Sequence, residues 1–523
     1  MQRKSPDASK NALFSRNSTG LVKSVSFFDS ISINMIYMSI GAGLAGIGFT
    51  TILLPSMSGV NLVYASLIAA LITIPQAVVY SMMTQRMPRT GADYVWVSRS
   101  LGGWFGSAIT FTGITMETMP YVALIAISFV FAIGSVGLFF EPSSKIFSGL
   151  SIPNVSGTVG AAPITQFEIA ALAVLLLVLL NIFLPRIGIK LVTACFVIGI
   201  IALVLSIGFL LRAGSNGIAS YITSLKISGT TYDSIAASYS GPSFSFVPTL
   251  LMIPFFYIFT YPWFNGLVAV GSELRGKDTR KWNAPISLIL ATIITTVPFA
   301  VMYYVAGLPF INGALANRNL VENYAFNFWT LGMGVAPNKA FAFVVGLGWI
   351  IWEVGIMAYG IILISRYLFA QSFDRFLPDK LATVSERFGS PIYAHTVDLI
   401  ITVIVIGLGI GFYGTAANLY GNVAASMIFF AFVGVAVSVY AIRRERGKSR
   451  TGLALAGISQ AIVFAFVTYL FFAYAGIWGG NYLSYGYIVT SFVGGLIIYL
   501  VARNYHMRKG LNIDLVFKEI PPE

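Results

Sequence analysis

Long apolar stretches separated by short polar segments are the dominant pattern of this chain. A helix needs about 20 mostly apolar residues to cross the hydrocarbon core of a bilayer, and twelve stretches reach that length. The stretches are residues 28–55, 62–85, 103–136, 167–184, 190–211, 246–272, 286–308, 340–369, 394–413, 417–441, 452–474 and 483–503. The pattern predicts an all-α integral membrane protein with twelve transmembrane helices.

The first apolar stretch carries a run of glycines at the depth where a membrane helix most needs its hydrogen bonds. Four glycines fall between Ser39 and Gly48, and glycine supports a helix poorly. Lipid offers no partner to an open backbone, so a break here must be buried in protein or line a polar cavity. The run therefore marks a candidate binding site. The alternative is that these glycines only let neighbouring helices pack closely.

The sixth stretch contains a second predicted break, at Pro262. Proline lacks an amide hydrogen and crowds the carbonyl four residues back, which leaves Ile258 without its helical partner. Asn265 and Gly266 loosen the chain just after it. Interrupted helices at corresponding positions of two halves point to the central site of a transporter. We therefore expect helices one to five to repeat as helices six to ten in inverted orientation, followed by two further helices.

Two connections between the apolar stretches are predicted to form short helices. Residues 309–339 carry an amphipathic pattern around Val321 to Phe328. Residues 86–102 mix aromatic and basic side chains, which is typical of a helix that lies at the membrane interface.

The composition agrees with a membrane protein. Hydrophobic residues make up 57% of the chain, charged residues 10%, and the mean hydropathy is +0.82. A net charge of +13 could suggest a nucleic-acid partner, but the placement of the charge argues against one. With twelve helices both termini lie on one side, and 27 of the 32 Lys and Arg residues fall there. The positive-inside rule assigns this side to the cytoplasm, which predicts a multi-pass protein of the cell membrane with both termini cytoplasmic.

The expected organisation has four parts. They are a cytoplasmic N-terminal tail (residues 1–25), a transport core of helices one to ten (26–445), helices eleven and twelve (446–503), and a cytoplasmic C-terminal tail (504–523).

Three stretches of sequence are similar to one known family. They are Ile40-Gly41-Ala42-Gly43-Leu44, then residues 87–99 with Pro88-Arg89-Thr90-Gly91-Ala92-Asp93-Tyr94, then Ser365-Arg366 with Asp374 to Pro378 and Phe388 to Pro391. Together they resemble the amino acid-polyamine-organocation (APC) superfamily of permeases over roughly residues 25–445. The resemblance implies a LeuT-like fold of two inverted five-helix repeats, with helices one and six discontinuous, and an activity in amino acid transport.

The chain departs from the family pattern at several places. Ala45 stands where the family has Phe, and the bulky Tyr261-Pro262-Trp263 replaces a turn of small residues. Some proton-coupled relatives carry a lysine in helix five, whereas residues 191–211 contain no charged residue. Proton coupling through a lysine is therefore not indicated.

An amino acid substrate needs replacements for the water around its carboxylate and its ammonium group. The half-helix after the first break presents amides and the positive end of its dipole, which suit a carboxylate. The half-helices before the two breaks end in open carbonyls, which suit an ammonium group. The predicted substrate-binding residues are Ser39, Ile40, Gly41, Ala42, Gly43, Ile258, Phe259, Thr260, Tyr261 and Trp263.

Aromatic side chains are expected beside this site. Tyr261 and Trp263 could pack on the substrate or close over it, and ordinary packing between helices is the alternative. The apolar surroundings favour a neutral or apolar amino acid.

Glu117 and Glu353 are predicted near mid-membrane, in helices three and eight. Burial disfavours a charged carboxyl group, so each is a candidate to take up and release protons during transport. Pro120 should free the carbonyl of Met116, which could then accept a hydrogen bond from a protonated Glu117. The alternative for both is a neutral carboxyl that serves helix packing.

These features favour a secondary transporter for amino acids that works by alternating access, as a proton-coupled symporter or an exchanger. Sodium symport through carbonyls at the first break and helix eight is an alternative, as is transport of polyamines or other organic amines. A membrane receptor or enzyme is more remote, because the histidines, His395 and His506, both fall near the predicted inner surface. With a single cysteine, Cys195, the sequence predicts no metal site, and it predicts no cofactor.

Overall fold

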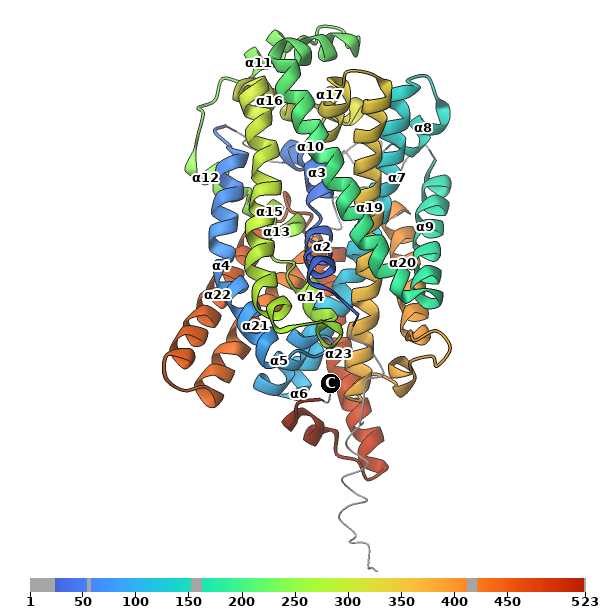
Figure 1. Ribbon diagram of the computed structural model, residues 1–523, viewed down its shortest axis with the longest axis vertical. Helices are drawn as coiled ribbons and strands as arrows, with labels where there is room; N and C mark the ends of the chain where they lie inside the picture. Colours follow the sequence, from blue (N-terminus) through green and yellow to red (C-terminus); the bar gives the residue numbers. More distant parts are fainter. Residues whose placement is uncertain (1–23, 54–57, 152–161, 412–420, 522–523) are drawn as a thin grey trace, which may run out of the picture.

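The computed structural model describes residues 24–53, 58–151, 162–411 and 421–521, and this part of the chain is helical without β-strands. Its helices run mostly along the long axis of the molecule (Figure 1). Eleven of them are long and apolar enough to cross a membrane. All but the last two residues of the expected N-terminal tail, residues 1–25, lie outside the described residues.

The long helices form the body of the molecule. They are α4 (Leu62–Arg86), α7 (Glu117–Phe140), α9 (Pro163–Phe183), α10 (Pro185–Ser224), α15 (Lys277–Ala306), α19 (Lys339–Phe373), α20 (Ile392–Gly411), α21 (Ala424–Arg444), α22 (Gly447–Ala473) and α23 (Tyr482–Arg508). Before α7, the short α6 (Gly103–Thr110) and a π-helical turn, η1 (Phe111–Met116), continue the same span.

The first span is interrupted. It consists of α2 (Phe27–Tyr37) and α3 (Ile40–Leu53), and Ser39 between them has a φ of +53°, in the left-handed region. Few residues other than glycine adopt this conformation, so the chain changes direction at the start of the glycine run.

The sixth predicted helix, residues 246–272, is interrupted over a longer stretch than the first. It consists of α12 (Phe246–Leu251), α13 (Ile253–Phe259) and α14 (Asn265–Ala269), and the chain is not helical from Thr260 to Phe264. No single helix here is long enough to span a bilayer, so the described residues contain eleven candidate spans where twelve were expected.

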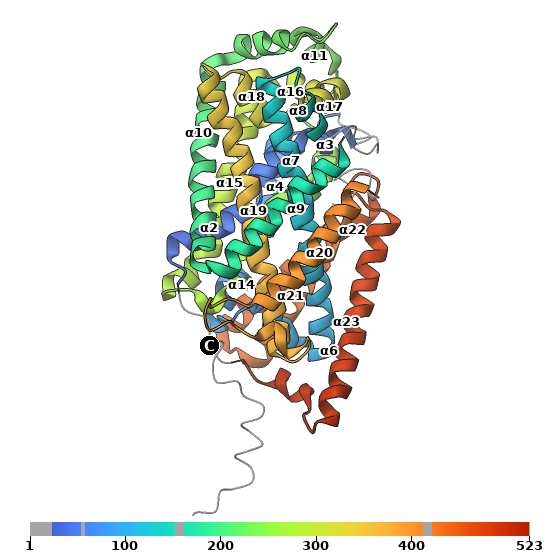
Figure 2. The same cartoon turned by 90° about the vertical axis from the view of Figure 1, so that its right-hand side faces the viewer.

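Short helices gather at the two ends of the molecule. At one end lie α11 (Tyr232–Ser238), α16 (Leu308–Ala316) and α17 (Arg318–Tyr324), and at the other lie α5 (Ala92–Leu101) and α6, near the C terminus (Figures 1 and 2). We call the latter the α5 end. The remaining short elements are α8 (Lys145–Leu150), α18 (Phe328–Gly334), η2 (Gly271–Glu273), η3 (Asp379–Ala382) and η5 (Ile513–Lys518). The two connections expected to be helical thus form α5 and the group α16 to α18.

Glycines allow α10 and α19 to approach each other closely. A Cβ at Gly348 would collide with the methyl group of Ala202, and one at Gly355 would lie 2.8 Å from the Cβ of Cys195. Contacts of this kind hold membrane helices together, because lipid gives no hydrophobic driving force for helix pairing. The seam between α10 and α19 lies directly beside the first break.

Gly348→Leu should destabilise the protein, because the added side chain has no space between α10 and α19. Overpacking of this kind costs about 1–3 kcal/mol, which a denaturant titration in detergent would detect as a lower midpoint. Gly208→Leu is the matched control, since Gly208 lies on α10 with no atom within 4 Å of its added Cβ. Equal midpoints for the two variants would contradict this account of the seam.

Candidate functional site

The first break places a helix start in the interior. α3 begins at Ile40, so the amides of Ile40, Gly41 and Ala42 belong to its first turn, where helical amides have no intrahelical partner. The amide of Gly43 differs from the expectation, since it donates a hydrogen bond to the carbonyl of Ser39 at 2.9 Å. The Gly43 amide is thus paired within the chain, and the first-turn amides of α3 are those of residues 40–42.

Gly41 packs against a tryptophan. A Cβ at this position would overlap the indole of Trp352 on α19. The carbonyl of Gly41 accepts a hydrogen bond from Nε1 of Trp329 at 2.9 Å, and both tryptophans are fully buried. The absence of a side chain at Gly41 therefore makes room for the indole of Trp352, as well as allowing a substrate to approach the backbone closely.

The second break supplies its own cap. Thr260 leaves the helix with φ −136° and ψ −83°. The carbonyl of Ile258, which Pro262 frees, accepts a hydrogen bond from Nε1 of Trp263 at 2.9 Å. This carbonyl is one of those expected to bind the substrate ammonium, and the hydrogen bond from Trp263 uses one of its two lone pairs.

Side chains from three other helices satisfy the rest of the break. Gln76 on α4 donates to the carbonyl of Pro262 at 2.6 Å, and Tyr359 on α19 donates to the carbonyl of Gly266. Asn34 on α2 accepts from the amide of Leu267, in the first turn of α14, at 3.0 Å. One carbonyl of the non-helical segment and two backbone groups in the first turn of α14 are therefore paired with buried side chains.

The two breaks lie next to each other. A Cβ at Gly43 would be 3.0 Å from the Cβ of Phe259, so the start of α3 packs on the end of α13. The structure thus brings two of the predicted site residues, Gly43 and Phe259, into contact. Tyr261 points elsewhere, because its hydroxyl contacts that of Ser66 on α4 at 2.7 Å. The Ser66 hydroxyl in turn contacts that of Thr296 on α15 at 2.8 Å.

Trp263 belongs to a buried aromatic cluster that the sequence prediction did not include. Its ring meets Tyr37 edge to face at 5.6 Å between centroids and stacks on Tyr121 at 5.3 Å. The hydroxyls of Tyr37 and Tyr121 are buried without a hydrogen-bond partner in the described part of the chain. Buried polar groups are normally paired, so unpaired hydroxyls beside two helix breaks mark a place for a polar ligand. The signal in the sequence was position: Tyr37 immediately precedes the first break, and Tyr121 follows Glu117 by one helical turn.

Glu117 follows the π-helical turn η1 and faces α21. The hydroxyl of Ser426 lies 2.8 Å from Oε2 of Glu117 and 2.5 Å from the carbonyl oxygen of Gly113. One hydroxyl hydrogen cannot serve both oxygens. When Ser426 donates to the Gly113 carbonyl, the contact with Glu117 needs a proton on the carboxyl group. The geometry thus suits a carboxyl that holds a proton.

Glu353 has a different setting. Its Oε1 accepts hydrogen bonds from Ser128 on α7 at 3.0 Å and from Trp349 at 3.2 Å. The bond from Ser128 connects α7 to α19, and that from Trp349 lies within α19, which fits the packing alternative. The Met116 carbonyl freed by Pro120 accepts a hydrogen bond from Tyr487 at 2.7 Å, so it has a partner other than Glu117.

At the α5 end, two ion pairs hold the inner parts of the broken helices. Arg366 on α19 pairs with Glu273 at 2.8 Å, both buried, and Lys190 on α10 pairs with Asp29 on α2 at 2.8 Å. The amides of Ser24 and Val25 also donate to the carbonyl of Glu273 at 3.0 Å. A cavity of about 510 Å³ is lined in part by the Arg366–Glu273 pair, together with Arg186 and Arg387.

Asp93 on α5 is a further buried carboxyl group that the sequence prediction did not single out. It accepts hydrogen bonds from the hydroxyls of Tyr80 at 3.0 Å and Tyr367. Burial raises the pKa of Asp93 to about 6, although these two hydrogen bonds act in the opposite direction. The same helix is attached to α14, since the Gly91 amide donates to the carbonyl of Ala269 at 3.1 Å.

Comparison with known proteins agrees with this architecture. The family described as "Amino acid permease" matches residues 26–502. A protein of Sulfolobus islandicus rod-shaped virus 1, named "Uncharacterized protein 399", is 34% identical over 90 residues. That match covers 17% of this chain and 22% of the viral protein, so it concerns only a fraction of either.

Asp93→Asn should change how stability depends on pH. Because the pKa of Asp93 is about 6 when folded and near its ordinary 3.8 when unfolded, the folded protein holds a proton that the unfolded chain releases. Stability from this group is therefore present at low pH and is lost as pH rises toward and through 6. The free energy of unfolding of the variant relative to the natural protein should rise by on the order of 3 kcal/mol between pH 4 and 7.

The exposed Asp278 gives the control, since Asp278→Asn should leave the pH dependence of unfolding unchanged. A parallel pH profile for Asp93→Asn and the natural protein would show that burial of Asp93 does not have this effect.

Proposed function

The chain belongs to the amino acid permease family, and on this basis we propose that it is a secondary transporter that moves amino acids by alternating access. Members of this family are transporters rather than enzymes. The observation that carries the proposal is the pair of adjacent helix breaks, joined where Gly43 packs on Phe259. Backbone of this kind is tolerated at membrane depth only where protein or a cavity surrounds it.

The proposed substrate site lies between the first turn of α3 and the aromatic cluster. The amides of Ile40, Gly41 and Ala42 and the positive end of the α3 dipole suit a carboxylate. The ring of Trp263 and the unpaired hydroxyls of Tyr37 and Tyr121 suit an ammonium group, through a cation–π contact and hydrogen bonds. Tyr37, Tyr121 and Trp263 are uncharged, and Glu117 beside them is proposed to carry a proton rather than to bind the substrate. This favours a neutral or apolar amino acid over a polyamine.

Glu117 is the proposed proton carrier. It lies one helical turn before Tyr121 on α7, so both side chains share a face of that helix. Its Oε1 has no hydrogen-bond partner in the described residues, and the contact with Ser426 accommodates a carboxyl proton. Protonation can therefore respond to a substrate that binds beside Tyr121. Glu353 is assigned to helix packing.

Sodium coupling at the first break is less well supported. A hard cation needs several oxygen ligands. The carbonyl of Gly41 is occupied by Trp329, and the indole of Trp352 fills the space between Gly41 and Gly199 of α10. These contacts favour a proton as the coupling ion.

The α5 end is the proposed cytoplasmic end, with both termini on that side of the cell membrane. The ion pairs Arg366–Glu273 and Lys190–Asp29 then close the path from the central site to the cytoplasm. Opening requires both pairs to separate. The cavity lined in part by the Arg366–Glu273 pair, Arg186 and Arg387 is then cytoplasmic. The transport core of residues 26–445 is proposed to be two inverted five-helix repeats of the LeuT-like fold, in which α3 and α14 each follow one break.

Purified protein in liposomes should take up labelled neutral amino acids with saturation, and faster when the same amino acid is loaded inside. Empty liposomes and a Gly41→Trp variant, whose added side chain overlaps Trp352, are the controls. The absence of saturable uptake or exchange across a panel of all common amino acids and polyamines would refute the proposal.

Glu117→Gln should abolish uphill uptake driven by a pH gradient, because the side chain can no longer release a proton. Exchange of internal for external substrate should remain within about twofold of the natural protein, since glutamine keeps the hydrogen bond to Ser426. Glu353→Gln serves as the comparison and should retain uphill uptake. Uphill uptake by Glu117→Gln at the natural rate would remove Glu117 from the coupling mechanism, whereas loss of exchange as well would show a structural role.

A further inference from the structure

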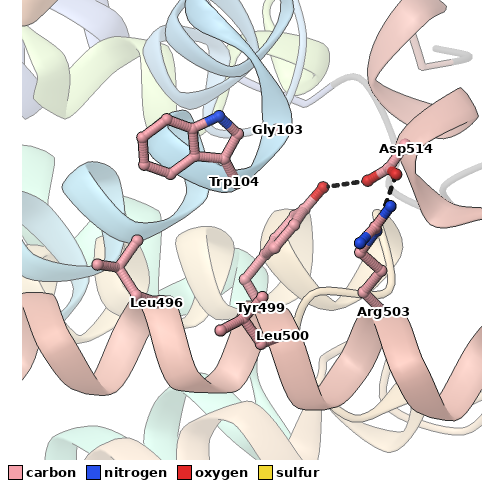
Figure 3. Close-up of a pocket in the computed structure, with 7 residues that line it drawn as sticks. All are labelled: Gly103, Trp104, Leu496, Tyr499, Leu500, Arg503 and Asp514. Atoms are coloured by element: carbon pink, nitrogen blue, oxygen red, sulfur yellow. Dashed lines mark hydrogen bonds and ion pairs between the residues drawn. The ribbon is translucent and has the colours of Figure 1, made fainter.

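A cavity of about 550 Å³ opens at the α5 end, away from the proposed substrate site (Figure 3). Its walls come from the start of α6, the last part of α23 and the short helix η5. The lining side chains are those of Trp104, Leu496, Leu500, Tyr499, Arg503 and Asp514. Nothing in the transport proposal uses these residues.

The lining changes from apolar to polar along the cavity. Figure 3 shows Leu496 at one end and the Asp514–Arg503 pair at the other, with the rings of Trp104 and Tyr499 between them. Asp514 accepts hydrogen bonds from the Tyr499 hydroxyl at 2.6 Å and from Nε of Arg503 at 2.9 Å. A ligand that fills this cavity needs a hydrocarbon part and a charged, hydrogen-bonding part.

The apolar end faces the region that lipid occupies. α23 is a peripheral membrane helix, and only 17% of its most apolar window is buried. Trp104 and Leu500 are each 55% exposed on this surface. Arg503 and Asp514 remain partly exposed, so their free hydrogen-bonding groups can reach a ligand that arrives from the bilayer. Tryptophan and arginine near the end of a membrane helix are typical of the headgroup level.

We propose that this cavity binds a membrane phospholipid whose headgroup carries a hydrogen-bond donor. One acyl chain lies along Leu496 and Leu500, against the face of Trp104. The lipid phosphate binds the terminal NH₂ groups of Arg503, which the bond to Asp514 through Nε leaves available. The amine or hydroxyl of the headgroup donates to Asp514.

Asp514 determines the headgroup class. Its carboxylate offsets the charge of Arg503, so an anion without a hydrogen-bond donor binds only weakly to this pair. An ethanolamine or glycerol headgroup offers N–H or O–H donors to the carboxylate, whereas choline has none. A second copy of the chain is the competing occupant of the cavity. A flat protein surface would not place a hydrocarbon group, a phosphate and a hydrogen-bond donor in the order that the cavity lining matches.

Native mass spectrometry of the full-length protein in detergent would test the site directly. The probes are phosphatidylethanolamine, phosphatidylglycerol and phosphatidylcholine with identical acyl chains. We expect the first two to be retained about tenfold more tightly than the third, the ratio typical of one charge-assisted hydrogen bond. Equal retention of all three lipids would overturn the proposal.

Three variants locate the binding. Arg503→Gln and Trp104→Ala should each reduce retention of phosphatidylethanolamine about tenfold. Asp514→Asn should reduce the preference for phosphatidylethanolamine and phosphatidylglycerol over phosphatidylcholine. Arg508→Gln, at an exposed arginine on the same helix, is the matched control and should bind lipid as the natural protein does.

Two outcomes would contradict the assignment. One is retention that is unchanged in both Arg503→Gln and Trp104→Ala, which would place the lipid elsewhere. The other is a dimer in the natural protein that Trp104→Ala dissociates without loss of lipid, which would identify the cavity as a subunit interface. Neither depends on transport activity, so failure here is distinguishable from failure of the proposed function.

Discussion

A backbone that leaves the helix inside a membrane must find its hydrogen-bond partners within the protein, and the centre of this molecule is arranged around that requirement. Each open group for which a partner is described meets a buried side chain, mostly from a different helix. The pairs are Trp329 with the Gly41 carbonyl, Trp263 with that of Ile258, Gln76 with that of Pro262, Tyr359 with that of Gly266, and Asn34 with the Leu267 amide. Breaks that would otherwise cost several kcal/mol each are thereby stable enough to persist.

These hydrogen bonds also determine which helices are attached to one another. Asn34 joins α2 to the start of α14 and donates to Asn283 on α15, so α2 and α14 are attached to each other and to α15. Gln76 and Tyr359 attach the same break to α4 and α19. Any motion of α14 relative to α4 and α19 would have to exchange the second set of bonds. Since an unpaired buried group is costly, such exchange favours discrete states over gradual deformation.

The sequence predicted the helical class and the positions of both breaks, because glycine and proline act locally on the backbone. It did not predict what occupies the space that they open. The role of Gly41 depends on Trp352 and Trp329, which lie about 300 residues away and meet it only through the packing of α18 and α19. Tyr37 and Tyr121 were not among the predicted site residues, and only the structure shows their hydroxyls buried without a partner in the described part of the chain. The sequence also did not predict how far the break at Thr260 shortens the helices of residues 246–272, none of which is long enough to be counted among the eleven candidate spans of the described residues.

The close seam between α10 and α19 has a practical consequence. It encloses Cys195, which is the single cysteine of the sequence and is buried. A thiol without access to solvent reacts slowly with alkylating reagents. The natural chain is therefore a suitable background for site-directed labelling without prior cysteine removal. Cysteines introduced at the exposed positions Arg186 and Arg387 would carry spin or fluorescent probes across the cavity at the α5 end, and would report its width in a working protein.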